Sequence, residues 1–184
     1  MKIEYHGAPF VGWQRQDNGT SIQEAVEAAI EKFSGERVRV FGAGRTDAGV
    51  HALGQVAHFD LAKVTDSETI ANALNAHLRT NSIAVLFVEA VNENFDARHS
   101  ARTRVYEYLI VNRRAPLTGE RGRGWKVARP LDAAILSEAG HRATPLTIEP
   151  PGSRRWYWPR RLGRGLAGLR LATRITATSG ARAM

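Results

Sequence analysis

The chain has 184 residues, of which 43% are hydrophobic and 24% are charged, and it contains no cysteine. This composition predicts a globular protein with a real core, and it excludes disulfide bonds and thiolate metal sites. No apolar run approaches the roughly 20 residues that a membrane helix needs, and the first residues lack the apolar core of a signal peptide. A cytoplasmic protein without a membrane partner is expected.

The net charge of +8 is unevenly distributed along the chain. Residues 1–140 hold 17 Lys and Arg against 17 Asp and Glu, whereas residues 141–184 hold nine Arg and a single acid, Glu149. The overall charge is therefore poor evidence about the part of the chain that precedes residue 141.

The first 97 residues read in the order strand, helix, strand, strand, helix, strand. The expected strands cover residues 2–7, 37–41, 55–61 and 82–91, and the expected helices cover residues 20–35 and 66–78. Ser21 and Glu24 form a capping box at the start of the first helix, and Gly35 suits its exit. The apolar residues that share one face at helical spacing are Ile22, Val26, Ala29, Ile30 and Phe33 in the first helix, and Ile70, Leu74 and Leu78 in the second.

This element order predicts an α+β fold. It is the βαββαβ pattern of ferredoxin-like and RRM-like domains, which have an antiparallel sheet. We expect this N-terminal domain at residues 1–97. A strand at residues 103–112 and a helix at residues 131–140 then predict the start of a second, similar domain at residues 98–140, which is incomplete.

The composition changes after about Gly140. Residues 141–184 hold nine Arg, six Ala, five Gly and four Pro, and they follow no steady helical or strand period. Such a segment is typical of a disordered basic tail. The same composition is also expected from out-of-frame translation of an arginine- and alanine-rich coding sequence. Both interpretations stay open.

A cluster of basic residues lies within the second predicted domain, from Arg98 to Arg129. Two acids, Glu107 and Glu120, stand in this region against nine basic residues: Arg98, Arg102, Arg104, Arg113, Arg114, Arg121, Arg123, Lys126 and Arg129. Basic side chains among Tyr106, Tyr108 and Trp125 suit an RNA backbone with bases to stack on. A solvated charged face without a ligand would have the same composition.

The sequence Gly-Ala-Gly-Arg-Thr-Asp-Ala-Gly-Val-His at residues 42–51 is the main candidate for chemistry. An aspartate in a glycine-rich turn usually caps its own backbone. Asp47 also has Arg45 two residues away, and a guanidinium can hold a carboxylate ionised and oriented. A carboxylate can act as nucleophile or general base without a cofactor. The spacing of His51, His58 and His99 does not suggest a metal site.

Residues 42–59, GAGRTDAGVHALGQVAHF, resemble the signature of the A-type tRNA pseudouridine synthases. Three further segments are similar to this family in the same order: IEYHGAPFVGWQRQ at residues 3–16, SIQEAVEAAI at residues 21–30 and FDARHSARTRVYEYLI at residues 95–110. The resemblance covers roughly residues 1–140. The chain departs from the family pattern after Gly140. Neither the F-x-x-F-R-like segment nor the later strand–helix motif of the family's second half occurs there.

The resemblance implies a function and a set of site residues. Asp47 matches the catalytic aspartate, Arg45 the arginine that pairs with it and helps open the substrate helix, and Tyr106 the tyrosine that packs against the target base. His51 and Gln55 fall in the substrate-binding set. The family isomerises uridine to pseudouridine in the anticodon stem-loop of tRNA, at positions 38 to 40, as a homodimer without metal or cofactor. The alternative is a non-catalytic family fragment, or a weak RNA-binding module that uses the basic cluster and the basic tail.

Overall fold

The computed structural model describes residues 1–132, 135–136, 146–149 and 168–176. The chain divides into two compact units, Met1–Ala101 and Arg102–Met184. No helix among these described residues is long and apolar enough to cross a membrane.

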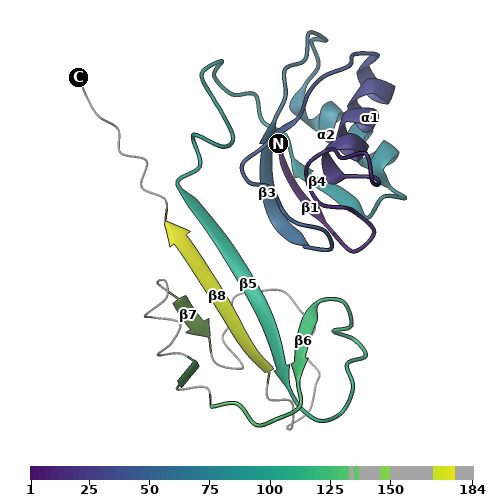
Figure 1. Cartoon of the computed structure of the whole chain (residues 1–184). Coiled ribbons are helices and arrows are strands. Elements are labelled where there is room, and N and C mark those ends of the chain that lie inside the picture. Colours follow the sequence, from purple (N-terminus) through teal and green to yellow (C-terminus); the bar gives the residue numbers. More distant parts are fainter. Residues whose placement is uncertain (133–134, 137–145, 150–167, 177–184) are drawn as a thin grey trace, which may run out of the picture. The chain divides into compact units, whose positions relative to one another are not determined.

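The first unit is an α+β structure with two helices and one four-stranded antiparallel sheet (Figure 1). Its elements are β1 (Lys2–Tyr5), α1 (Ile22–Ser34), β2 (Phe41–Gly42), β3 (Ala52–His58), α2 (Ser67–Leu78) and β4 (Ile83–Phe87). The strands lie in the order β2-β3-β1-β4, and every neighbouring pair is antiparallel. The predicted order of helices and strands is thus present in this unit.

Both helices begin at a side-chain cap. The Oγ of Ser21 accepts a hydrogen bond of 3.1 Å from the backbone N–H of Glu24, and Asp66 accepts one of 2.8 Å from Thr69. Gly35 ends α1 with φ 79°, the left-handed conformation of a C-terminal glycine. The first helix is therefore specified locally, as the sequence predicted.

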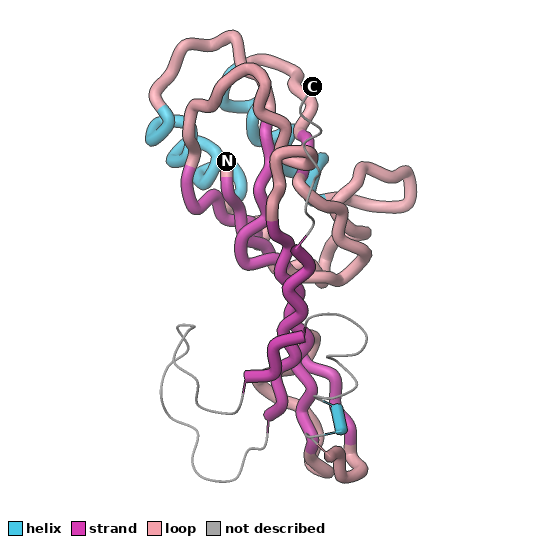
Figure 2. The backbone as a smooth tube through the Cα atoms, turned by 90° about the vertical axis from the view of Figure 1, so that its left-hand side faces the viewer, coloured by secondary structure: helices cyan, strands magenta, loops and turns pink. Residues whose placement is uncertain are grey.

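The core lies between the sheet and the two helices, which cover one of its faces (Figures 1 and 2). Four of the predicted face residues of α1 are buried; the fifth, Phe33, is half-buried beneath the Lys63 ammonium group, 4.4 Å from the ring centroid. Leu74 and Leu78 of α2 are buried against the same core. The sheet contributes Ile3, Tyr5, Ala57, Ile83 and Val85.

All four strands of the first unit differ from their predicted bounds: β1 ends at Tyr5 rather than at residue 7, and β4 covers Ile83–Phe87 rather than residues 82–91. The strand predicted at residues 37–41 is a strand only at its end, in β2. The backbone groups of Val40 bond to helix side chains instead: its N–H donates to Glu27 at 3.0 Å and its carbonyl oxygen accepts from Gln23 at 3.2 Å. The strand predicted at residues 55–61 begins and ends three residues earlier, because β1 pairs with residues 52–56.

The second unit contains a separate sheet with the strand order β6-β5-β8-β7. Its strands are β5 (Thr103–Asn112), β6 (Gly124–Val127), β7 (Leu146–Glu149) and β8 (Gly168–Thr176). β5 matches the predicted strand and pairs with β6 in parallel, while β5–β8 and β7–β8 are antiparallel. Of the helix predicted at residues 131–140, only residues 135–136 are described as helical, and residues 133–134 and 137–140 lie outside the described residues. Apart from β7 and β8, the tail at residues 141–184 also lies outside them.

Candidate active site on the glycine-rich loop

The loop between β2 and β3 carries Arg45 and Asp47 and is seated on the segment that precedes α1. The backbone N–H of Trp13 donates to the carbonyl oxygen of Thr46 at 2.9 Å, and the N–H of Gly49 donates to that of Phe10 at 3.3 Å. These bonds connect residues more than 30 positions apart. The loop is therefore held by tertiary contacts, which is how a catalytic loop is fixed on a rigid scaffold.

Two predicted substrate-binding residues also form hydrogen bonds in the loop region. The Nδ1 of His51 accepts a hydrogen bond of 3.1 Å from the N–H of Gly7, and its ring lies 4.4 Å from that of His6. The side-chain amide of Gln55 donates to the carbonyl oxygen of Gly44 at 2.6 Å. The hydrogen bonds of both side chains thus connect parts of the loop region to one another.

Arg45 and Asp47 are both exposed, whereas Thr46 between them is half-buried. This alternation presents the guanidinium and the carboxylate to solvent and turns the threonine inward. No hydrogen bond or ion pair joins Arg45 to Asp47 within the described ranges. The structure therefore brings the two side chains onto one short loop without pairing them.

Thr46 reaches a buried tyrosine that sequence analysis did not assign to the site. Its Oγ1 lies 2.8 Å from the hydroxyl of Tyr5, which is only 4% exposed. Burial raises the pKa of Tyr5 above its usual value, and hydrogen bonding to Thr46 and Gln55 offsets part of that increase. Trp13, 2% exposed, lies beside this tyrosine with 6.3 Å between the ring centroids. The inner side of the loop is thus closed by aromatic side chains.

Two glycines have backbone conformations that this arrangement needs. Gly49 has φ 78° within a turn closed by a bond of 3.2 Å from the N–H of Val50 to the carbonyl oxygen of Asp47. Gly12 has φ 121°, and a Cβ there would lie 2.8 Å from the carbonyl oxygen of Thr46. Glycine is therefore required both in the loop and in the segment beneath it.

Tyr106 lies in the second unit, on β5, and its side chain is 38% exposed. Because side chains alternate along a strand, Arg104 and Tyr108 share its face. Trp125 of β6 pairs with Ile110 in the parallel register and is therefore on that face too. Tyr108 and Trp125 are also exposed, so this face offers aromatic surface next to a basic side chain.

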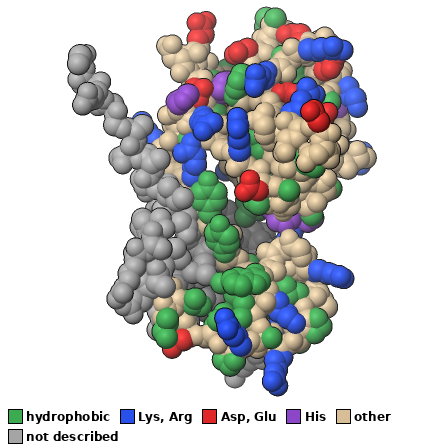
Figure 3. All heavy atoms as spheres, viewed as in Figure 1, with side chains coloured by type: hydrophobic (Ala, Val, Ile, Leu, Met, Phe, Trp, Pro, Cys, Tyr) green, Lys and Arg blue, Asp and Glu red, His purple; other side chains and the backbone are tan. Residues whose placement is uncertain are grey.

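The predicted basic cluster is largely accessible. Seven of its nine side chains are exposed: Arg98, Arg102, Arg114, Arg121, Arg123, Lys126 and Arg129. Arg113 is less exposed and lies 3.8 Å from Glu120 in an ion pair. In Figure 3, Lys and Arg side chains are spread over the visible surface of both units, and hydrophobic side chains gather on the second. Such a surface suits a phosphate backbone with accessible bases.

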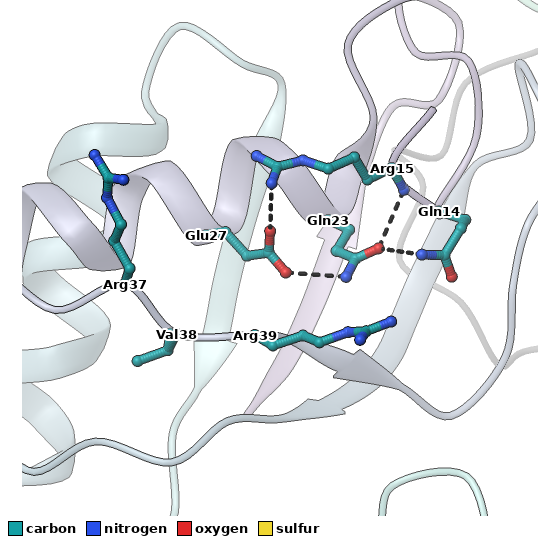
Figure 4. Close-up of a pocket in the computed structure, with 7 residues that line it drawn as sticks. All are labelled: Gln14, Arg15, Gln23, Glu27, Arg37, Val38 and Arg39. Carbon is teal, nitrogen blue, oxygen red and sulfur yellow. Dashed lines mark hydrogen bonds and ion pairs between the residues drawn. The ribbon is translucent and has the colours of Figure 1, made fainter. Parts of the chain in front are cut away.

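A pocket of about 380 Å³ lies between α1 and the segments that flank it (Figure 4). Its lining residues are Gln14, Arg15, Gln23, Glu27, Arg37, Val38 and Arg39. Gln23 is at its centre: it accepts from the side chain of Gln14 at 2.8 Å and the N–H of Arg15 at 3.1 Å, and donates to Glu27 at 2.9 Å. The network joins the loop before α1 to the helix.

The described residues contain no group of three or more His, Cys, Asp or Glu side chains that could hold a metal ion. The chemistry that the loop itself offers is that of an exposed carboxylate with an exposed guanidinium two residues away. Such a carboxylate can act as a nucleophile or as a base.

A family model described as tRNA pseudouridine synthase matches residues 1–100. Three similar proteins carry the name tRNA pseudouridine synthase A. The protein of Methylocella silvestris is 57% identical over 139 residues, that of Methylobacterium radiotolerans 54% over 142, and that of Parvibaculum lavamentivorans 52% over 139. The alignments cover 76%, 77% and 76% of this chain, respectively, and 56% of each relative. The chain thus spans little more than half the length of these relatives.

Proposed function

This chain belongs to the tRNA pseudouridine synthase family, and from that premise we propose that it isomerises uridine to pseudouridine in the anticodon stem-loop of tRNA, at positions 38 to 40. The observation that carries the proposal is the exposed carboxylate of Asp47 on a loop held by backbone bonds to the segment before α1. A fixed, accessible carboxylate is what a cofactor-free rearrangement of a nucleoside needs.

The reaction exchanges one bond to the ribose for another. The bond between N1 and C1′ breaks, the uracil turns, and a bond forms between C5 and C1′; the proton on C5 leaves and N1 gains one. Asp47 acts either by adding to the base or by taking part at the sugar, and both routes balance without an oxidant or a metal. Because the base must leave its stack, the exposed Arg45 acts by entering the helix as the nucleotide flips out.

The other site residues take supporting roles in this proposal. Tyr106 packs against the flipped uracil, a role that its partly exposed ring on β5 supports. His51 and Gln55 hold the loop against the substrate, a role that their hydrogen bonds to Gly7 and to the carbonyl oxygen of Gly44 support. The basic cluster binds the phosphate backbone of the stem.

The fold of the first domain, the domain bounds, the oligomeric state and the cellular location are part of the same proposal. The strand order β2-β3-β1-β4 with two helices on one face supports a ferredoxin-like, RRM-like first domain. The domain bounds 1–97, 98–140 and 141–184, an incomplete second domain, a homodimer and a cytoplasmic location stay predictions.

The test is release of tritium from tRNA that carries uridine labelled at C5, since the C5 proton is lost when the new bond forms. We expect release by the full chain and loss of at least about 1,000-fold in Asp47→Ala. Asp60→Ala, which removes another exposed carboxylate of the first unit, is the matched control and should keep the wild-type rate. Equal rates of tritium release for the two variants would show that Asp47 takes no part in the reaction.

A second candidate function is a non-catalytic RNA-binding module, which the exposed basic cluster favours. Such a module would release no tritium and would bind tRNA with an affinity that falls steeply with salt. Replacing Arg121 and Arg123 by Ala should then reduce the slope of log affinity against log salt by about 2. Tritium release from the wild-type chain would exclude this alternative.

A further inference from the structure

We propose that Tyr5 and Thr46 are positioning residues for Asp47: the hydrogen bond between their hydroxyl groups fixes the backbone from which the carboxylate is presented. The inference rests on the catalytic role proposed above for Asp47. It deepens that role by naming what holds the carboxylate in place.

Thr46 is fixed at two separate points. Its Oγ1 lies 2.8 Å from the hydroxyl of Tyr5, and its carbonyl oxygen accepts a bond of 2.9 Å from the N–H of Trp13. One point lies on the side chain and the other on the peptide group shared with Asp47. Together they restrict the dihedral angles on either side of Thr46, and hence the direction in which the next side chain leaves the loop.

Tyr5 is a rigid anchor for this bond. It ends β1, which is an interior strand between β3 and β4, and its side chain is 4% exposed. Loss of a hydrogen bond by a buried hydroxyl is unfavourable. Movement of the loop away from β1 would leave the Tyr5 hydroxyl without its bond to Thr46, so the fold itself favours one loop position.

The position of the carboxylate matters because reacting atoms must approach to about 3–3.5 Å, and a displacement of about 1 Å can reduce a rate by roughly 100-fold. Arg45 and Asp47 are exposed and the structure gives them no hydrogen bond or ion pair to each other in the described ranges. The two side chains therefore do not orient each other. Their orientation depends on the backbone of the loop, which Thr46 anchors through Tyr5.

The experiment uses the full chain with Tyr5→Phe, Thr46→Val and Thr46→Ser, and Thr69→Val as a control at an exposed threonine of the same unit. In Tyr5→Phe and Thr46→Val we expect kcat for tritium release to fall by roughly 10- to 100-fold, with tRNA affinity within about twofold of wild type. Thr46→Ser keeps the hydroxyl and should restore most of the rate. The double variant of Tyr5 and Thr46 should lose no more than either single one, because both remove the same bond.

A second readout needs no turnover. The N–H groups of Gly49 and Val50 bond to Phe10 and Asp47, so their hydrogen exchange reports how firmly the loop is held. We expect exchange at both amides to become roughly 2- to 10-fold faster in Tyr5→Phe and Thr46→Val, the range for loss of one hydrogen bond, and to stay unchanged in Thr46→Ser.

Unchanged exchange in Tyr5→Phe and Thr46→Val would overturn the proposal, whatever the activity. Accelerated exchange in a chain that releases no tritium would instead support the anchor and contradict the catalytic role of Asp47. Loss of tRNA affinity with unchanged kcat would also overturn the proposal, because it would assign the pair to binding.

Discussion

The backbone N–H of Trp13 donates a 2.9 Å hydrogen bond to the carbonyl oxygen of Thr46, and so joins two segments of the first unit that resemble the family. Trp13 belongs to the GWQRQ segment, and Thr46 lies between Arg45 and Asp47. The two motifs are 33 positions apart in the chain but form one structural unit. The GWQRQ segment is therefore part of the support of the candidate catalytic loop.

We expect Gly12→Ala to destabilise the first unit by about 2–4 kcal/mol. Gly12 has φ 121°, and a Cβ there would lie 2.8 Å from the carbonyl oxygen of Thr46, so the variant is strained and also clashes with backbone. Urea unfolding measures the change. Gly35→Ala is the control: its φ is 79° but no atom lies within 4 Å of the added Cβ, so only about 1 kcal/mol should be lost. Equal losses in the two variants would contradict the close approach to Thr46.

The parts of the fold that the sequence could predict are those with local causes. The spacing of Ile22, Val26 and Ile30, the cap at Ser21 and the exit at Gly35 are all contained within α1 or next to it. β2 could not be delimited in this way. The backbone of Val40 bonds to side chains of α1 that lie 13 and 17 positions earlier, and no local pattern shows such partners.

The candidate site also contains residues that the local sequence indicates and residues that depend on distant partners. Asp47 and Arg45 could be assigned because the motif that carries them is short and continuous. Tyr5 could not, because its partner Thr46 is 41 residues away and its own strand pattern indicates only that the ring is buried. The one available hint was the position of Thr46, a hydroxyl residue between two charged ones.

Gln23→Leu should destabilise the first unit by about 2–4 kcal/mol. Leucine fills a similar volume but lacks the amide, so the buried partners of Gln23 lose their hydrogen bonds. Gln23 is 4% exposed and accepts hydrogen bonds from Gln14 and Arg15 while it donates to Glu27 and Val40 (Figure 4 draws its bonds to the first three). The substitution leaves the backbone N–H of Arg15 and the carbonyl oxygen of Val40 without this partner. Thermal or urea unfolding gives the change.

Gln16→Leu serves as the control for that experiment. Gln16 is exposed, and its amide donates to the carbonyl oxygens of Val11 and Gln14 in contact with solvent. Water can replace those bonds, so the change should stay within about 0.5 kcal/mol. A loss in Gln16→Leu as large as that in Gln23→Leu would mean that burial of the network does not matter.

The free energy of unfolding should fall as the pH rises above about 10, in part because of Tyr5. Burial holds the pKa of Tyr5 above its value in the unfolded chain, so at alkaline pH the folded state binds more protons than the unfolded state. The contribution is fully present below the unfolded-state pKa and is lost as the pH rises toward and through the folded-state pKa. Urea unfolding between pH 8 and pH 11 measures this dependence.

Tyr5→Phe separates this effect from the other groups that titrate in the same range. Below pH 10 the variant should be less stable than wild type by roughly 0.5–1.5 kcal/mol, because it lacks the hydrogen bond to Thr46. Since phenylalanine cannot ionise, the difference should shrink as the pH rises above 10. A difference that stays constant up to pH 11 would show that the Tyr5 hydroxyl ionises as easily in the folded chain as in the unfolded one, and would contradict its burial beneath the loop.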